Sequence, residues 1–370
     1  GTDRFKKEFG LFAYADGSGS VQDNQSLRIR PEASVREWRV GKLPEVNDAV
    51  KSQYPKIWQE VLAALKIDTR RGGHGRHGTG ENIAKRVYAE SGWDHTLTRF
   101  GDHPQDYLPV DLNSLLYGYA EILGQIFQEV EKPDEAQYFL NEKYQIGLSM
   151  NKWMFDPKSY LYLDYNMKDK KISSTVTAAS FFAFEAELYP KSSTAELLNS
   201  QKILHQLIRH LKPGLPKDFN KAKTFLRQSI KNPDPKRFIG MMTTDHEGTG
   251  QWDGSWTWAP LVEMAFQALM KYQMPEHAAW LTVDWCEMVI VQFELTGVFW
   301  EKYWGQDGSI EIPKGSEIYG NEEGFGWTNG TLNVFLKYLS ETKLEGQSLL
   351  DILNDRLQRR VELHKRHLAR

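Results

Sequence analysis

Apolar residues along most of this chain recur every three or four positions, which is the spacing of one buried face of a helix. The pattern begins near Val46 and is interrupted by polar, glycine-rich or proline-containing stretches. It predicts nine helices, at 46–65, 112–127, 133–153, 174–188, 195–211, 258–272, 276–295, 329–340 and 346–366. Residues 1–45 look irregular, residues 160–165 alternate as in a short strand, and residues 212–238 form a polar connection.

Long irregular loops precede or separate the predicted helices at 67–93, 239–257 and 297–327. No repeat of 20–50 residues is visible, which argues against a regular solenoid. Paired helices with long loops favour an all-α toroid in which the loops at one end carry the function.

Composition removes several classes of protein. The 370 residues are 40% hydrophobic and 26% charged, which is ordinary globular usage. The net charge is −3, which gives no bulk attraction to nucleic acid or to an anionic membrane. Cys286 is the single cysteine, so an intramolecular disulfide is excluded. No apolar run of 18 residues occurs, and the sequence leaves open a cytoplasmic, periplasmic or secreted location, because it starts at Gly1 without an initiator methionine.

Tryptophan is concentrated late in the chain. Eight of the 12 tryptophans lie between residues 252 and 327. A tryptophan offers a large apolar face and one hydrogen-bond donor, which suits stacking on a sugar ring. Packing of a large core is the alternative interpretation.

Three loops combine carboxylates, tryptophan and glycine just before a helix, at 90–94, 248–260 and 315–330. Glycine lets the backbone approach a ligand closely. Neighbouring aromatic rings exclude water and raise the pKa of a carboxyl group. A glycosidase needs one protonated carboxylic acid and one carboxylate, so the loops are typical of such an enzyme. A Gly-Trp-Asp turn is also a common helix cap, and that alternative applies to each loop alone.

Five segments follow one another in the order known from one enzyme family. They are Arg30-Pro-Glu-Ala33, Ser91-Gly-Trp-Asp94 with Arg99-Phe100, Leu108-Pro-Val-Asp-Leu-Asn-Ser-Leu-Leu116, Gln251-Trp-Asp-Gly-Ser-Trp-Thr-Trp-Ala-Pro260 and Glu323-Gly-Phe-Gly-Trp-Thr-Asn-Gly330. Together they resemble the trehalases of glycoside hydrolase family 37, over about residues 11 to 340.

The resemblance implies an inverting hydrolysis of α,α-trehalose to two glucose molecules. Asp94 would be the general acid and Glu317 the general base, with Glu322 and Glu323 as rival candidates for the base. Inversion requires the two carboxyl groups to be about 6.5–9.5 Å apart, which leaves room for the attacking water.

The resemblance also implies a sugar-binding set and no metal or organic cofactor. The set is Arg30, Glu32, Gly92, Trp93, Gln251, Trp252, Asp253 and Trp327. A surface ion pair is the alternative for Arg30 with Glu32, and core packing is the alternative for the tryptophans. Asp111 and Asn113 belong either to the site or to a cap of the helix after Pro109. His74 and His77 lie in a glycine-rich loop without a neighbouring carboxylate, so we do not expect a metal there.

Two departures from the family keep other functions open. Ser255-Trp256 stands where the family has Pro-Asn, so a related α-linked disaccharide or glycoside is an alternative substrate. The family's first signature, Pro-Gly-Gly-Arg-Phe followed by Tyr-x-Trp-Asp, does not occur in this sequence. An inactive trehalase-like sugar-binding chain is therefore a second alternative.

The expected fold is an (α/α)6 toroid-like barrel whose first helices are missing from this chain. We expect residues 1–370 to form a single catalytic domain, the C-terminal three-quarters of the family's domain, with residues 1–45 packed at the active-site end. The expected partner is a small disaccharide, not nucleic acid or a membrane. A missing N-terminal fragment or a second chain would complete the barrel.

Overall fold

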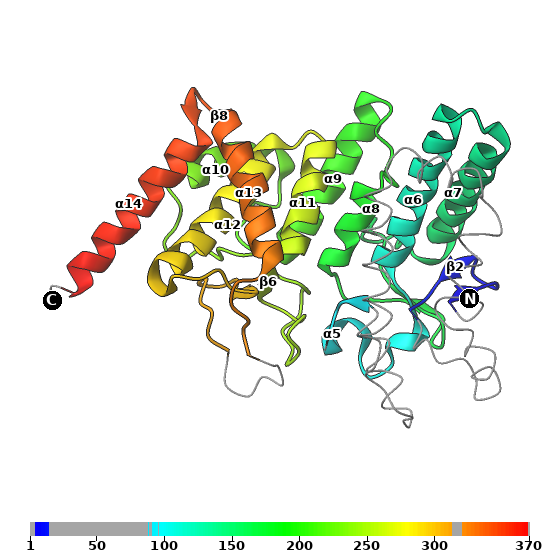
Figure 1. Cartoon of the computed structure of the whole chain (residues 1–370), viewed down its shortest axis with the longest axis horizontal. Coiled ribbons are helices and arrows are strands. Elements are labelled where there is room, and N and C mark those ends of the chain that lie inside the picture. The colour runs from blue at the N-terminus through cyan, green and yellow to red at the C-terminus, as the bar shows by residue number, and fades with distance from the viewer. Residues whose placement is uncertain (1–3, 15–87, 89–90, 95, 313–319, 369–370) are drawn as a thin grey trace, which may run out of the picture. The chain divides into compact units, whose positions relative to one another are not determined.

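The computed structural model describes residues 4–14, 88, 91–94, 96–312 and 320–368 (Figure 1). Apart from Tyr88, these residues belong to one compact unit made of Gly1–Tyr14 and Ser91–Arg370. The predicted helix at 46–65 and the loop with His74 and His77 lie outside the described residues.

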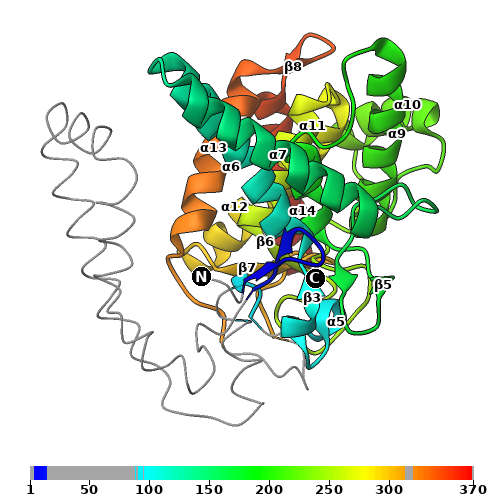
Figure 2. The same cartoon turned by 90° about the vertical axis from the view of Figure 1, so that its right-hand side faces the viewer.

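The described part of the chain is mostly helical, as predicted. Its helices are α5 (Leu97–Phe100), α6 (Val110–Glu129), α7 (Pro133–Trp153), α8 (Phe181–Glu185), α9 (Thr194–Leu211), α10 (Phe219–Lys231), α11 (Ala259–Lys271), α12 (Pro275–Thr296), α13 (Gly326–Glu341) and α14 (Leu349–Leu368). Successive helices pack as pairs, α6 on α7, α11 on α12 and α13 on α14, while α8 contacts both α6 and α11. Figures 1 and 2 show α6 and α7 lying side by side.

The connection predicted at 212–238 was wrong in one respect, because it contains α10. Asp218 caps this helix by accepting hydrogen bonds from the backbone N–H groups of Asn220 and Lys221, at 2.8 and 3.1 Å. The buried residues of the helix recur at helical spacing: Phe219, Ala222, Leu226 and Ile230. This narrow apolar stripe packs on α12 and is easily overlooked among lysine, asparagine and glutamine residues.

The helix predicted at 174–188 is shorter than expected. It consists of a 3-10 turn, Ala178–Ser180, followed by α8. The hydroxyl of Thr177 accepts a hydrogen bond from the N–H of Ala179 and so starts the turn late. The chain leaves the helical conformation after α8, since Glu187 has a φ of 62°.

Short strands connect the helices. Of the strand predicted at 160–165, only Tyr165 lies in a strand, β4 (Tyr165–Asn166), between β3 (Tyr107–Leu108) and β5 (Lys171–Ile172). The other pairs are β6 (Trp256–Trp258) with β7 (Lys302–Trp304) and β8 (Lys343–Leu344) with β9 (Gln347–Ser348).

A small hairpin forms where the sequence looked irregular. Its strands are β1 (Phe5–Lys6) and β2 (Leu11–Phe12), and it packs on α6 and α7 (Figure 2). The amide of Asn113 accepts from the Phe12 N–H and donates to the Phe12 carbonyl, both at 2.9 Å. The hairpin is thus fixed to the first turn of α6 by one side chain. Residues 15–45 lie outside the described part of the chain.

A buried ion cluster joins α9, α12 and α14. The carboxylate of Asp284 lies 3.0 Å from the Lys212 ammonium, 3.1 Å from Arg237 and 2.6 Å from Arg356. Burial alone would raise the pKa of Asp284, but these cations hold it below its usual value. Burial lowers the pKa of Lys212 to about 8. Removing one partner would leave the others buried and uncompensated.

We therefore expect Asp284→Asn to lower the free energy of unfolding by about 3–5 kcal/mol, as breaking a buried ion pair does. Urea denaturation measures this change. Glu187→Gln is the control, because it removes an exposed pair with Lys191 at 2.8 Å, which contributes about 1 kcal/mol or less. A loss in Asp284→Asn no larger than in the control would contradict the importance of the cluster.

Two buried histidines meet between α9 and α12. Nδ1 of His205 lies 3.0 Å from Nε2 of His277, and Nε2 of His205 lies 3.0 Å from the Pro216 carbonyl oxygen. The carbonyl can only accept, so His205 donates from Nε2 and accepts at Nδ1 from His277. Burial lowers the pKa of His277 to about 3 and also lowers the pKa of His205.

This pair predicts a loss of stability in acid. Below about pH 6.5, His277 binds a proton in the unfolded chain but stays neutral in the native protein. The free energy of unfolding therefore falls as the pH drops toward the native pKa of His277. Between about pH 7 and pH 5, the wild type should lose about 2 kcal/mol more than His277→Gln. The exposed His210 supplies the control, His210→Gln, which should follow the wild type. Parallel curves for the wild type and His277→Gln would refute the prediction.

Candidate active site

The turn that carries the predicted general acid has the conformation that its glycine permits. Gly92 has a φ of 72°, which favours glycine over residues with a side chain. The Trp93 N–H donates to the Ser91 hydroxyl at 3.0 Å. Trp93 is buried and Asp94, which follows it, is half-buried. The turn therefore places an apolar ring and a carboxyl group next to each other.

Arg99 packs against this turn through the Trp93 ring. Its guanidinium makes two hydrogen bonds to Asp164, at 2.8 and 2.9 Å, and two to Asp111, at 2.8 and 2.9 Å. Its central carbon lies 4.2 Å from the centre of the Trp93 ring, in a cation–π contact. Burial alone would lower the pKa of Arg99, but the two carboxylates outweigh it and raise the pKa above its usual value.

The capping alternative for Asp111 and Asn113 was wrong. Pro109 occupies the N-cap position of α6, and no side chain caps that helix. Asp111 is the buried partner of Arg99, and Asn113 holds Phe12. Asp111 therefore supports the turn through Arg99, whereas Asn113 ties α6 to the hairpin.

Tryptophans from three loops form one cluster. The rings of Trp252 and Trp258 are stacked, with centroids 3.8 Å apart and planes inclined by 2°. Trp327 meets both rings edge-on, at 6.4 and 5.7 Å, and Trp93 lies 5.5 Å from Trp252. The structure thus brings together three predicted site residues, Trp93, Trp252 and Trp327. We name Trp93, Trp252, Trp258 and Trp327 the tryptophan cluster.

A buried carboxylate that we did not predict lies at this cluster. The indole N–H of Trp327 donates to the backbone carbonyl of Glu301 at 3.0 Å, and the Glu301 residue is only 3% exposed. Its carboxylate lies 2.7 Å from the Lys302 ammonium, which in turn lies 5.3 Å from the centre of the Trp258 ring. Burial lowers the pKa of Lys302, and Glu301 opposes that effect.

The sequence around Glu301 contained a usable signal. Trp300-Glu-Lys-Tyr-Trp304 places a carboxylate between aromatic residues inside the loop at 297–327. The predicted rivals Glu322 and Glu323 are exposed, and Glu317 lies outside the described residues. Arg30 and Glu32 also lie outside them.

Gln251 and Asp253 flank Trp252 and are both buried. The backbone carbonyl of Gln251 accepts from the Trp258 indole N–H at 2.9 Å, whereas its side-chain amide has no hydrogen-bond partner in the described structure. The carboxylate of Asp253 accepts hydrogen bonds from residues 96–98. The segment 251–253 is therefore joined to the loop that follows Asp94.

Ser255 and Trp256, where the family resemblance fails, belong to the ribbon beside the cluster. Trp256 is 2% exposed, and its ring meets Trp304 edge-on at 5.1 Å, across the β6–β7 pair. The Ser255 hydroxyl donates to the carboxylate of Glu247. The tryptophan thus adds bulk within the ribbon that carries Trp258 and Lys302.

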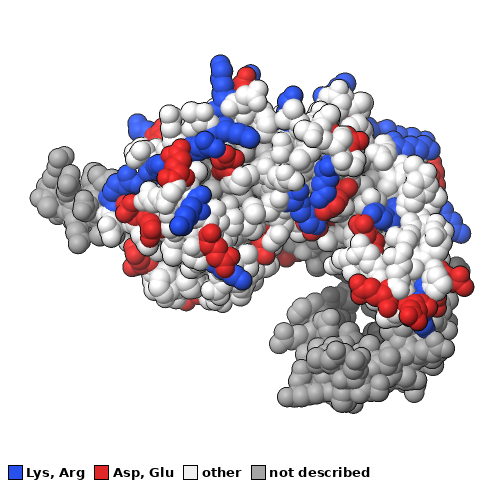
Figure 3. Space-filling model, turned by 90° about the horizontal axis from the view of Figure 1, so that it is seen from above, with Lys and Arg blue, Asp and Glu red and all other residues white. Residues whose placement is uncertain are grey.

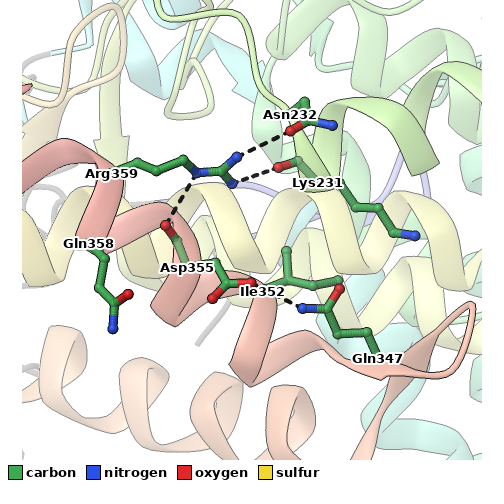
Figure 4. A pocket seen from close by; sticks show the side chains of 7 residues that line it. All are labelled: Lys231, Asn232, Gln347, Ile352, Asp355, Gln358 and Arg359. Carbon is green, nitrogen blue, oxygen red and sulfur yellow. Dashed lines mark hydrogen bonds between the residues drawn. The ribbon is translucent and has the colours of Figure 1, made fainter.

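Other surfaces of the described residues offer weaker candidates. A pocket of about 450 Å³ lies between α10, β9 and α14, and no predicted site residue lines it (Figure 4). Its lining is Lys231, Asn232, Gln347, Ile352, Asp355, Gln358 and Arg359. In the part of the chain that the structure describes, no three metal-ligating side chains meet.

Charge is mixed on the visible surface. Figure 3 shows acidic and basic side chains interspersed on the face seen from above, without a field of one sign. Among the described helices, none has the length and apolar character needed to cross a membrane.

Comparison with known proteins gives a consistent result. The sequence profile of the trehalase family matches residues 77–340. The periplasmic trehalase of Escherichia coli O1:K1 is 26% identical over an alignment of 324 positions that covers 83% of this chain and 50% of that protein. The periplasmic trehalase of Salmonella dublin is 28% identical over an alignment of 297 positions that covers 77% of this chain and 44% of that protein.

A solved structure shares the fold. The neutral trehalase of Saccharomyces cerevisiae aligns with 92% of this chain and 54% of its own, with a TM-score of 0.57 and 22% identity. This chain spans about half the length of the curated relatives it matches.

The buried contacts of Arg99 should contribute to the stability of the protein. Arg99→Lys keeps the charge but cannot bind both carboxylates in a bidentate manner, so we expect unfolding free energy to fall by about 2–4 kcal/mol. Denaturant titration checks this value. Arg227→Lys, at an exposed pair with Glu276, should change stability by about 1 kcal/mol or less. Equal effects in the two variants would count against the anchoring role.

Proposed function

We propose a hydrolytic function on the premise that this chain belongs to the trehalase family. The proposed reaction is inverting hydrolysis of α,α-trehalose to two glucose molecules, which would make the protein an α,α-trehalase. The observation that most supports it is that Trp93, which precedes Asp94 in the turn, packs against Trp252 within the tryptophan cluster. Aromatic rings beside a half-buried carboxyl group suit glycoside cleavage.

The proposed mechanism uses two carboxyl groups. Protonated Asp94 gives its proton to the oxygen that bridges the two sugars, and the bond from that oxygen to the anomeric carbon breaks. A water attacks the anomeric carbon from the opposite face and gives its proton to a carboxylate base. One glucose leaves with the bridging oxygen, and the other gains the water's hydroxyl group with inverted configuration.

Two residues are proposed for the base. Glu317 is the choice that the family resemblance supports. Glu301 is supported by the geometry, because the residue is buried, its backbone carbonyl accepts from the Trp327 indole N–H, and its carboxylate is paired with Lys302. Glu322 and Glu323 remain as exposed rivals with less shielding from water.

The remaining sugar contacts are also proposals. Arg30, Glu32, Gly92, Trp93, Gln251, Trp252 and Trp327 form the proposed binding set. Asp253, which the resemblance also placed in this set, is left out, because its carboxylate accepts hydrogen bonds from residues 96–98 and from Gly250. The unpartnered amide of Gln251 supports its place in this set, because a buried polar group requires a partner. We also propose that residues 1–370 form one catalytic domain, with residues 1–45 at its active-site end. A further fragment or chain would complete an (α/α)6 barrel.

Two alternative functions differ in what they predict. Hydrolysis of a related α-linked disaccharide or glycoside is favoured by Trp256, which adds bulk within β6, the strand that also carries Trp258. A sugar-binding chain without turnover is the other alternative. A panel of α-linked disaccharides, together with a binding measurement for trehalose, separates these alternatives from the proposed function.

Glucose release from trehalose tests the proposal. Asp94→Asn should lower kcat by about 10²–10⁴-fold, because the leaving sugar loses its proton donor. Of Glu317→Gln and Glu301→Gln, the variant that lacks the base should lose a similar factor and the other should lose less. Glu187→Gln, at an exposed site, should match the wild type. NMR spectra taken early in the reaction should show β-glucose as the anomer formed at the attacked carbon.

The outcomes separate the assignments. Undiminished turnover in Asp94→Asn removes the general-acid role, and undiminished turnover in both glutamate variants removes both proposed bases. Binding of trehalose by the wild type without glucose release supports the sugar-binding alternative instead.

A further inference from the structure

We infer that Asp253 is a positioning residue that fixes the loop of the general acid, and that its carboxylate does not bind sugar. The inference rests on the proposed function and deepens it. It concerns a residue that the family resemblance placed among the substrate ligands, and it follows from where the two carboxylate oxygens point.

Five hydrogen bonds converge on this carboxylate. Oδ1 accepts from the Thr96 hydroxyl at 3.0 Å, the Thr98 N–H at 3.1 Å and the Thr98 hydroxyl at 2.6 Å. Oδ2 accepts from the Leu97 N–H at 3.2 Å and the Gly250 N–H at 3.1 Å. Asp253 itself is 1% exposed.

This set of donors leaves no acceptor capacity for a ligand. A carboxylate has about four lone-pair sites, and here five donors already share them. A sugar hydroxyl would have to displace one of these buried donors, which would then lose its partner. The carboxylate is therefore committed to the protein's own backbone and hydroxyl groups.

Four of the five donors belong to residues 96–98, which follow the general acid in the sequence, and the fifth is the Gly250 N–H of Asp253's own loop. Helix α5 starts at Leu97, and its N-cap residue Thr96 makes no side-chain cap hydrogen bond. Asp253 supplies, from a segment more than 150 residues away in the sequence, the acceptor that a capping side chain normally gives. Residues 96–98 are thus held by a carboxylate on another loop.

The two loops also touch closely. A methyl group at Gly248 would lie 2.4 Å from Oδ2 of Asp253 and 2.6 Å from Cγ2 of Thr98, so a larger residue does not fit there. The Thr98 hydroxyl lies 2.8 Å from the Thr244 hydroxyl. Residues 96–98 therefore pack closely against the segment 244–253.

Position is decisive for a general acid. It must lie within about 2.6–3.2 Å of the oxygen that it protonates, and a displacement of about 1 Å can cost about 10²-fold in rate. A loop without regular secondary structure does not hold a side chain so closely by itself. The contacts of Asp253 supply that constraint for the loop of Asp94.

Two substrates with different demands on the acid provide the test. Trehalose requires protonation of the departing glucose, whereas α-D-glucosyl fluoride releases fluoride without a proton donor. Asp253→Asn should lower kcat on trehalose about 10²-fold and kcat on the fluoride by less than about 5-fold, with KM for trehalose nearly unchanged. Gly248→Ala, which displaces the carboxylate without removing it, should show the same selective loss.

Asp156→Asn is the matched control. This carboxylate also caps a turn, accepting from the Ser159 N–H at 2.9 Å, the Ser159 hydroxyl at 2.6 Å and the Lys158 N–H at 3.2 Å. It belongs to none of the three loops of the site, so both rates should stay at the wild-type level.

The results against the inference are distinct. Equal losses on both substrates in Asp253→Asn would show a general structural role, and a raised KM for trehalose with kcat unchanged would show a sugar contact. If the wild type turns over neither substrate, the proposed function fails. Amide exchange at Leu97 and Thr98 then decides the inference: faster exchange in Asp253→Asn supports it, and unchanged exchange overturns it.

Discussion

Arg99 is a buried cation, and the rest of the candidate site depends on the two carboxylates that keep it there. Moving a guanidinium out of water costs several kcal/mol, and Asp111 and Asp164 offset this cost with four hydrogen bonds. These two residues come from the first turn of α6 and from the segment leading into β4. Asp164 also accepts from the Val110 N–H at 2.8 Å, so the start of α6 is fixed by the same group.

A second layer is built on this anchor. The guanidinium lies against the Trp93 ring, Trp93 lies beside Trp252, and Trp252 is stacked on Trp258. Trp327 meets Trp258 edge-on and donates a hydrogen bond to the backbone carbonyl of Glu301. Three loops without extended regular structure are thus held together, because each is tied to the next by a ring contact or a buried polar group.

The long helices could be predicted from the sequence because their signals are local. Pro133 marks the first residue of α7, and α12 begins at Pro275 within one residue of the prediction. α10 was missed because only four buried apolar residues carry its pattern. The chain turns away after α8 at Glu187, in a conformation that no residue preference indicated.

The tryptophan cluster was also visible in the sequence, since Trp93, Trp252 and Trp327 stand in recognisable motifs. The motifs did not predict the functions of the polar residues inside them. Asn113 holds a strand 101 residues away, and Arg99 pairs with Asp164, 65 residues away. Contacts at such separations follow from packing, and one sequence alone does not contain them. Glu301 was missed for a different reason, because its neighbours matched no motif that we had quoted.

The segment 251–258 performs three tasks at once, and this constrains how its chemistry can change. Asp253 holds the loop of Asp94, Trp252 and Trp258 form the stacked pair, and Trp258 lies opposite Lys302 in the β6–β7 ribbon. A substitution there that shifts the backbone would move the proposed acid and the buried Glu301–Lys302 pair together. Trp256 departs from the family pattern within this segment, yet its ring is accommodated against Trp304 and the ribbon's register continues past it. The departure therefore adds volume beside the tryptophan cluster and leaves the hydrogen bonds of Asp253 in place, so a change in substrate preference would not require a shift of Asp94, the proposed general acid.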